Sequence, residues 1–439
     1  MITSPSRPRR SGVAVFTLAA LGLAAAAAGP LAFSSASPVS ASVLNGMNCP
    51  PAIQKLNVPI DSEYYDADNP AVTTSISTGA LPPGISVRDS AVGGHYSGAP
   101  TKTGRYDFSL TVTDQYTNTQ SINCIVDVVP TDSKIERLSG EDRYTSAVRI
   151  ADAIETDTAP LIYIASGENF ADALSASAIA AQRGAPLLLT PRGDVPNLVY
   201  NTVSSLDPTN IVVVGGADTL NQNVIDQLKR AEPTATITRI DGVDRYAVSR
   251  NLIQHPQFGA MASTSLFVAT GQVFADALAA SPAAATVPTP VLLVNGPLTA
   301  LSAEEKALIA SRGVTKATVF GGSDTVSTGI ENDLRATAGT ADRIEGVNRY
   351  VGSAKVVEKF FPTAGPSGTV YLATGATYPD ALAGGVLAGV KKAPILLVSK
   401  SCMAAEVAAQ VRRLNPAKIV LLGGPNSLDA TLGTLPVCP

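Results

Sequence analysis

Residues 167–174 read Gly-Glu-Asn-Phe-Ala-Asp-Ala-Leu, and versions of this stretch occur three times in the chain. The second copy, at residues 271–278, reads Gly-Gln-Val-Phe-Ala-Asp-Ala-Leu, and the third, at residues 375–382, reads Gly-Ala-Thr-Tyr-Pro-Asp-Ala-Leu. Successive copies are 104 residues apart. A period of this length is too long for a solenoid unit and indicates a whole domain present in triplicate.

A second motif, Arg-x-x-Gly-x-(Asp/Asn)-Arg-Tyr, opens each unit, at residues 137–144, 239–246 and 343–350. Each unit also contains a Pro-aliphatic-Leu-Leu segment and a Gly-Gly pair after a later strand. Short apolar strands such as 161–165 alternate with helix-favouring segments such as the alanine-rich 171–182. This alternation predicts, in each unit, a parallel sheet that is covered by helices on both faces.

The composition is that of a globular protein. The chain has 439 residues, enough for about three or four domains, with 45% apolar and 15% charged residues. The formal net charge of −4 excludes a generally basic surface for nucleic acid. A local basic pocket remains compatible with that charge.

Residues 1–41 are typical of a secretory signal. A positive segment holds Arg7, Arg9 and Arg10. An apolar run at 13–28 and a Val-Ser-Ala sequence at 39–41 follow. The run is shorter than the ~20 residues that a spanning helix needs, which disfavours an uncleaved anchor. General secretion and twin-arginine export both stay open. No later segment is expected to cross a membrane, and without a sortase-type motif we expect surface retention to be non-covalent.

Residues 42–131 follow a different pattern from the triplicated units. Segments such as 106–113 and 121–128 alternate apolar and polar residues, and glycine- and proline-rich turns separate them. This pattern predicts a small antiparallel β-sandwich. Residues 66–69, Asp-Ala-Asp-Asn, have a calcium-like composition, but a solvated turn is the favoured interpretation, and no metal site is expected.

The four cysteines suggest disulfides in an exported protein. They are Cys49, Cys124, Cys402 and Cys438. Of the three possible connectivities, locality in the sequence favours Cys49–Cys124 and Cys402–Cys438. Neither pair has the spacing of a zinc site.

Given these motifs, the three units resemble the type 2 cell wall-binding repeats of Gram-positive surface proteins. Every copy carries each motif. The Leu-Pro-Pro-Gly-Ile-Ser sequence at 81–86, with 96–101 and 104–108, resembles the immunoglobulin-like domains of bacterial surface proteins.

The resemblance implies three α/β modules of the Toprim type around a pseudo-threefold axis. The expected boundaries are 42–131 for the immunoglobulin-like sandwich and 135–235, 236–340 and 341–439 for the repeats. It also implies non-covalent retention on the cell wall through an anionic polymer, either teichoic-acid-like or another secondary polysaccharide. The protein is then expected to be secreted and to stay at the cell surface.

Nine motif residues are candidates for contact with the polymer. They are Arg143, Arg245, Arg349, Asp172, Asp276, Asp380, Tyr144, Tyr246 and Tyr350. The guanidinium groups suit phosphate or carboxylate, and equally suit salt bridges between repeats. The aspartates fit either helix-start electrostatics or orientation of a neighbouring arginine. The tyrosines fit the core better than sugar stacking, since the chain has no tryptophan for a flat platform.

The sequence fits a binding module better than an enzyme. Its two histidines, His95 and His255, fall in different domains, and no Gly-x-Ser-x-Gly nucleophile motif is present. The strand ends lack the acidic residues that hold magnesium in catalytic Toprim domains, so no cofactor is expected. Triplication favours avid binding to a repeating polymer. The alternatives are surface adhesion with the sandwich as a spacer and, less favoured, a cell-wall hydrolase.

Overall fold

The computed structural model describes most of the chain. The described ranges are 49–50, 53–65, 72–90, 93–102, 104–114, 119–129, 134–154 and 158–438. The predicted leader at 1–41 and the acidic turn at 66–69 lie outside the described residues. No described helix has the length and apolar character needed to cross a membrane.

The N-terminal part is a β-sandwich, as predicted. Its strands are β1 (Ile53–Lys55), β2 (Ile60–Tyr65), β3 (Val72–Gly79), β4 (Ile85–Ser90), β5 (Gly93–Gly98), β6 (Gly104–Asp114) and β7 (Thr119–Val129). One sheet has the order β1-β7-β6-β3, and the other has the order β2-β5-β4. The pairs are antiparallel except for β1 with β7, which is parallel and departs from the expected all-antiparallel arrangement.

Alternation along the strands builds the sandwich core. Tyr96 from one sheet and Phe108 from the other are buried with their ring centroids 6.2 Å apart. Both predicted disulfides are present. Cys49–Cys124 ties the segment before β1 to β7, and Cys402–Cys438 closes the C-terminal part.

Each repeat contains four strands and, between them, three or four helices in the same order. The first has β8 (Ile135–Leu138), α1 (Arg143–Asp152), β9 (Leu161–Ser166), α2 (Phe170–Arg183), β10 (Leu187–Thr190), α3 (Asn197–Leu206), β11 (Asn210–Val214) and α4 (Gln222–Ala231). The second has β12 (Thr236–Ile240), α5 (Arg245–Gln254), β13 (Ser265–Thr270), α6 (Ala275–Thr286), β14 (Val291–Val294), α7 (Ala303–Ser311), β15 (Lys316–Phe320) and α8 (Thr328–Ala338). The third has β16 (Thr340–Ile344), α9 (Arg349–Phe360), β17 (Thr369–Thr374), α10 (Pro379–Val390), β18 (Ile395–Val398), α11 (Ala405–Leu414), β19 (Lys418–Leu422) and the short 3-10 helix η1 (Ala430–Thr434).

The opening strand of each repeat belongs to the sheet of the preceding repeat. The three parallel sheets have the orders β10-β9-β11-β12, β14-β13-β15-β16 and β18-β17-β19-β8. Strand β8 opens the first repeat and completes the sheet of the third repeat. There Ile135 pairs with Ile419, and Leu138 pairs with Leu422. This exchange closes the repeats into a ring.

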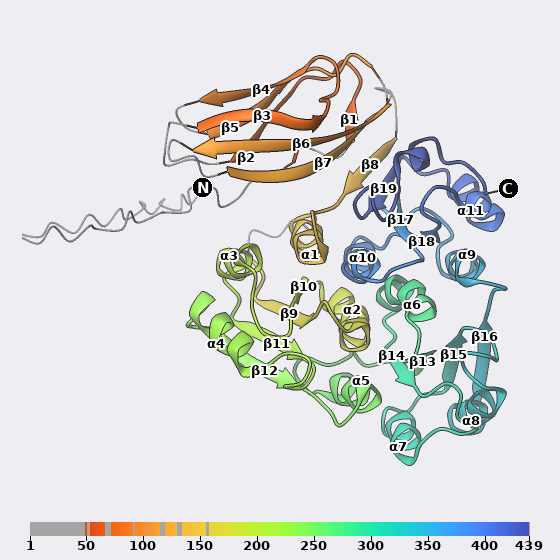
Figure 1. Cartoon of the computed structure of the whole chain (residues 1–439). Helices are drawn as coiled ribbons and strands as arrows, with labels where there is room; N and C mark the ends of the chain where they lie inside the picture. The colour runs from red at the N-terminus through yellow and green to blue at the C-terminus, as the bar shows by residue number, and fades with distance from the viewer. Residues whose placement is uncertain are drawn as a thin grey trace, which may run out of the picture. The chain divides into compact units, whose positions relative to one another are not determined.

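The alanine-rich helices α2, α6 and α10 pack against one another, and Figure 1 shows them side by side at the centre of the three repeats. Small residues allow the close approach. At Gly389 of α10, a methyl group would lie 2.7 Å from the Cβ of Ala181 and 2.8 Å from that of Ala285, which belong to the other two repeats. The predicted pseudo-threefold arrangement is confirmed, and small side chains determine its centre.

Candidate functional site

The (Asp/Asn)-Arg-Tyr part of the opening motif starts a helix. Asp142, Asp244 and Asn348 are the N-caps of α1, α5 and α9, and each side chain accepts one or two hydrogen bonds from backbone N–H groups of the first turn. The arginine that follows each cap is the first helical residue. The local sequence therefore fixes where the three candidate arginines lie.

Each of these arginines connects two repeats. Arg245 Nη1 donates a hydrogen bond to the carbonyl oxygen of Gly271 in its own repeat, at 2.7 Å. Its guanidinium carbon lies 5.5 Å from the ring centroid of Phe170, which belongs to the preceding repeat.

The other two arginines make the same contacts around the ring. Arg349 donates to Gly375 and lies 5.3 Å from the Phe274 ring, and Arg143 donates to Gly167 and lies 5.8 Å from the Tyr378 ring. The third repeat thus supplies the aromatic ring for the arginine of the first repeat. The arrangement is cyclic in space although the chain is linear.

The aromatic residues of the triplicated stretch meet one another. The ring centroids of Phe170 and Phe274 are 6.0 Å apart, those of Phe170 and Tyr378 5.6 Å, and those of Phe274 and Tyr378 5.7 Å. All three side chains are half-buried. The sequence-based candidates did not include this aromatic trio, although the recurrence of an aromatic residue three positions after the glycine was its signal.

The candidate aspartates lie in the first turns of α2, α6 and α10, as predicted. Asp172 and Asp380 are buried. Burial raises the pKa of the Asp172 carboxyl to about 6, against the opposing effects of a hydrogen bond with Thr219 and the positive charge of Arg245. Burial likewise raises the pKa of Asp276 and of Asp380.

Each aspartate is attracted by the arginine of the following repeat. Arg245 acts on Asp172, Arg349 on Asp276 and Arg143 on Asp380. No direct ion pair joins these aspartates to these arginines in the described part of the chain. The negative charge of each aspartate therefore acts on the neighbouring arginine through space, without a direct salt bridge.

The Gly-Gly turns make room for these carboxylates. Gly215, Gly321 and Gly423 have φ values of 118°, 105° and 112°, in the region that favours glycine. A Cβ at Gly321 would lie 2.3 Å from Asp276 Oδ2. The recurring glycine is therefore needed both for the turn and for the approach of the aspartate.

The first arginine of each opening motif fastens these turns. Arg239 donates to the carbonyl oxygens of Gly215 and Leu220, at 2.7 and 2.9 Å. Arg137 makes the corresponding bonds to Gly423 and Leu428, across the closure between the first and third repeats. These contacts give this set of arginines a structural role.

The candidate tyrosines lie against the glycine of the triplicated stretch. A Cβ at Gly167 would lie 2.6 Å from Cε1 of Tyr144, and Tyr246 and Tyr350 are placed in the same way. All three rings are half-buried and contact the hydrophobic core. These contacts lie within the protein, as the core interpretation of the three tyrosines expects.

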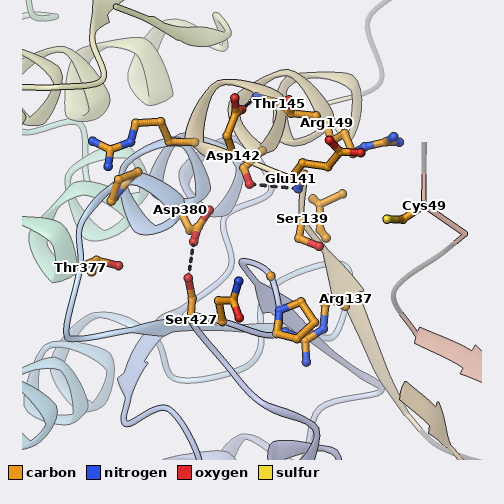
Figure 2. A pocket seen from close by; sticks show the side chains of 18 of the residues that line it. Cys49, Arg137, Ser139, Glu141, Asp142, Thr145, Arg149, Thr377, Asp380 and Ser427 are labelled. Atoms are coloured by element: carbon orange, nitrogen blue, oxygen red, sulfur yellow. Dashed lines mark hydrogen bonds between the residues drawn. The ribbon is translucent and has the colours of Figure 1, made fainter. Parts of the chain in front are cut away.

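A pocket lies where the third repeat meets the first. Its walls include Arg143, Thr377, Asp380 and Ser427. Figure 2 shows the hydrogen bond between Ser427 and Asp380, which is 3.2 Å long, with Thr377 close by. Among the described residues, no group of three or more histidine, cysteine, aspartate or glutamate side chains could hold a metal ion.

The raised pKa of Asp172 predicts a pH-dependent contribution to stability. The folded protein binds this proton more tightly than the unfolded chain, whose aspartate has an ordinary pKa of 3.8. The contribution is therefore largest below pH 3.8 and is lost as the pH rises through about 6, a change of at most about 3 kcal/mol. Asp172→Asn should flatten the dependence of the free energy of unfolding on pH in this window, measured by denaturant titration.

The matched control for this prediction is Asp218→Asn, which removes an exposed carboxylate of the same repeat. It measures the effect of removing one negative charge, against which the Asp172→Asn profile is compared. An Asp172→Asn profile that keeps the full slope between pH 4 and 6 would show that Asp172 titrates alike in the folded and unfolded states.

Comparisons with known proteins agree with this architecture. The family model described as Cell wall binding domain 2 (CWB2) matches residues 137–225, 239–331 and 343–432. The model described as "Putative Ig domain" matches residues 50–129.

Two curated relatives come from Bacillus subtilis (strain 168). N-acetylmuramoyl-L-alanine amidase LytC is 30% identical over 299 residues, which is 67% of this chain and 57% of the relative. The amidase enhancer is 28% identical over 296 residues, which is 67% of this chain and 39% of the relative. The match thus spans less than two-thirds of the length of either relative.

Two solved structures share the fold. Cwp6 from Clostridium difficile superimposes with a TM-score of 0.63 at 19% identity, covering 88% of this chain and 67% of that one. Cwp8 from the same organism gives a TM-score of 0.61 at 22% identity, covering 83% of this chain and 63% of that one.

Proposed function

Because the chain belongs to the cell wall binding domain 2 family and so associates with the cell wall, we propose that it is a secreted protein anchored there by an anionic polymer. The three arginines Arg143, Arg245 and Arg349 hold that polymer. The polymer is teichoic-acid-like or another secondary polysaccharide. The immunoglobulin-like sandwich is carried to the cell surface by this attachment.

The observation that carries the proposal is the unused hydrogen-bonding capacity of the three guanidinium groups. Within the described residues, each forms hydrogen bonds through Nη1 only, which leaves the N–H groups on Nε and Nη2 for a ligand. The backbone carbonyl and the aromatic ring hold each guanidinium in place. A phosphate or carboxylate can then be bound at a low cost in side-chain entropy.

The distribution of charge supports an anionic ligand. The third repeat, residues 341–439, has ten lysines and arginines against six aspartates and glutamates, whereas residues 135–235 have seven against thirteen. Arg349 belongs to the basic repeat, and Arg143 lies at its contact with the first repeat. A chain with a net negative charge thus offers a positive region to a polyanion.

We propose binding without catalysis, although two relatives carry amidase names. The aligned region omits a large part of both relatives, so their activities do not transfer with it. Both histidines of this chain have structural contacts away from the arginines. His255 Nδ1 accepts a hydrogen bond from the backbone N–H of Phe258. His95 Nδ1 lies 3.2 Å from Asp61 Oδ1.

Contact with another surface protein is the second candidate, and two exposed valines favour it. Val243 is 99% exposed and Val347 is 92% exposed, each two residues before a candidate arginine. Apolar side chains displayed in this way are common at protein contacts. A protein partner would use the same face as the polymer.

Wall preparations test the proposal directly. The exported chain should sediment with untreated walls and should remain in solution when acid extraction has first removed the secondary polymer. The released polymer, added back, should compete for binding, and salt should weaken retention because exposed charges are screened. Equal retention on stripped walls would overturn the polymer proposal and favour a protein or peptidoglycan ligand. Assay of released sugars and peptides in the same tubes tests for hydrolysis.

A further inference from the structure

The three candidate arginines surround the aromatic trio. Each guanidinium lies against one ring of the aromatic trio Phe170, Phe274 and Tyr378, at 5.3 to 5.8 Å from the ring centroid. The three rings contact one another in pairs, with centroids 5.6 to 6.0 Å apart. The arginines are therefore neighbours around the pseudo-threefold axis, although their positions in the sequence place them in three separate repeats.

We propose that the chain binds one anionic saccharide segment on this axis, and not three segments at three separate sites. The inference rests on the proposed function and specifies where and how many times the polymer is held. The aromatic trio forms the floor of the site, and Arg143, Arg245 and Arg349 form its rim. One negatively charged sugar unit contacts the floor with its apolar face and the rim with its acidic group.

The ends of the central helices add to the positive potential of this site. Helices α2, α6 and α10 each begin at or next to a residue of the aromatic trio. None of the three has a side chain hydrogen-bonded to its first turn from the N-cap position. Three positive helix ends thus point toward the floor on which the rings lie.

The three aspartates of the triplicated stretch limit how strongly charged the ligand can be. Asp172, Asp276 and Asp380 lie behind the arginines and partly offset their charge. A ligand with more charge per unit therefore gains less from this site than its charge alone predicts. A saccharide with one acidic group per unit gains from both the rings and the guanidinium groups.

Tyr378 makes the three parts of the site unequal. Its hydroxyl donates to the carbonyl oxygen of Glu168 at 3.0 Å and lies 3.4 Å from Arg143 Nη1. Phenylalanine stands at the two corresponding positions. The axis therefore has one polar side and two apolar sides, which gives a bound saccharide a single preferred orientation.

A tryptophan reporter tests the position of the site. The chain has no tryptophan, so Phe274→Trp places a single fluorophore on the axis. The control is Leu198→Trp, which places one at a position that is 44% exposed on α3. Short oligomers of acid-released wall polymer should change the emission of the Phe274→Trp protein and leave that of the control unchanged.

Calorimetry of the unmodified protein tests the number of sites and needs no variant. The expected result is one short oligomer bound per chain, with a sugar-free polyphosphate of similar charge binding at least about tenfold more weakly, as the loss of the ring contacts implies. Three oligomers per chain, or binding that leaves the axial tryptophan unchanged in a folded variant, would overturn the axial site and leave polymer anchoring intact. Failure of any oligomer to bind, together with full retention on stripped walls, would refute the proposed function itself.

Discussion

Gly389→Ala is expected to lower the free energy of unfolding by about 1–3 kcal/mol, and Gly389→Leu by more. An added methyl group would meet the Cβ atoms of Ala181 and Ala285 at distances well below van der Waals contact. These atoms belong to two other helices and cannot rotate away. The three central helices would have to separate, and the loss would affect all three repeats together.

Gly352→Ala is the matched control for this prediction. It makes the same change inside α9, where the nearest non-local atom to the new Cβ is 3.9 Å away. Alanine is favoured over glycine within helices by about 1 kcal/mol, so this variant should be as stable as the unmodified protein or more stable. Chemical denaturation of both variants measures the difference. A Gly389→Ala protein as stable as Gly352→Ala would show that the packing of the central helices accommodates an added methyl group.

Simultaneous replacement of Arg143, Arg245 and Arg349 by alanine is expected to weaken wall binding by about a thousandfold or more. Each replacement removes charge-assisted hydrogen bonds to the polymer, which are worth about 1.5–3 kcal/mol each, and three such losses give at least about a thousandfold. The variants should also unfold at a lower temperature, because each guanidinium holds a glycine carbonyl and an aromatic ring. Binding is therefore compared at a temperature where circular dichroism shows every variant to be folded.

The control for this triple variant removes the same charge elsewhere. Arg230, Arg335 and Arg412 are exposed arginines on α4, α8 and α11, and their replacement by alanine should reduce binding only slightly. Lysine at the three axial positions keeps the charge and loses the planar fork, so intermediate affinity is expected. If both triple variants lose binding to the same extent, the arginines act through net charge alone. If neither loses binding, the axial arginines are structural and do not hold the polymer.

Much of the fold followed from local patterns in the sequence. The spacing of the triplicated stretch predicted three α/β modules, and the structure contains them. Alternating residues predicted the sandwich, and sequence proximity predicted both disulfides. These features depend on burial and on neighbours along the chain, which a repeated or periodic sequence records directly.

The candidate site was only partly predictable. The helix-start position of the aspartates followed from sequence, but their partners did not, because Asp172 responds to Arg245 of the next repeat and not to an arginine of its own. The aromatic residues were visible as a recurrence without a role. Their convergence depends on three helices that pack side by side with their N-terminal ends together, and no single repeat contains that information.

The sequence by itself determined the number of modules, the secondary structure within each of them and the residues at their helix starts. Only the tertiary structure decided which repeat each opening strand joins and that the repeats close into a ring, with Arg137 and Gly423 in contact across 286 residues of chain. The physical reason is that the apolar–polar pattern and helix capping depend on neighbours along the chain, whereas strand pairing and convergence on an axis require all three repeats together. The triplicated stretch specifies the same structure three times, and the ring that those three copies form creates the one place where their arginines meet.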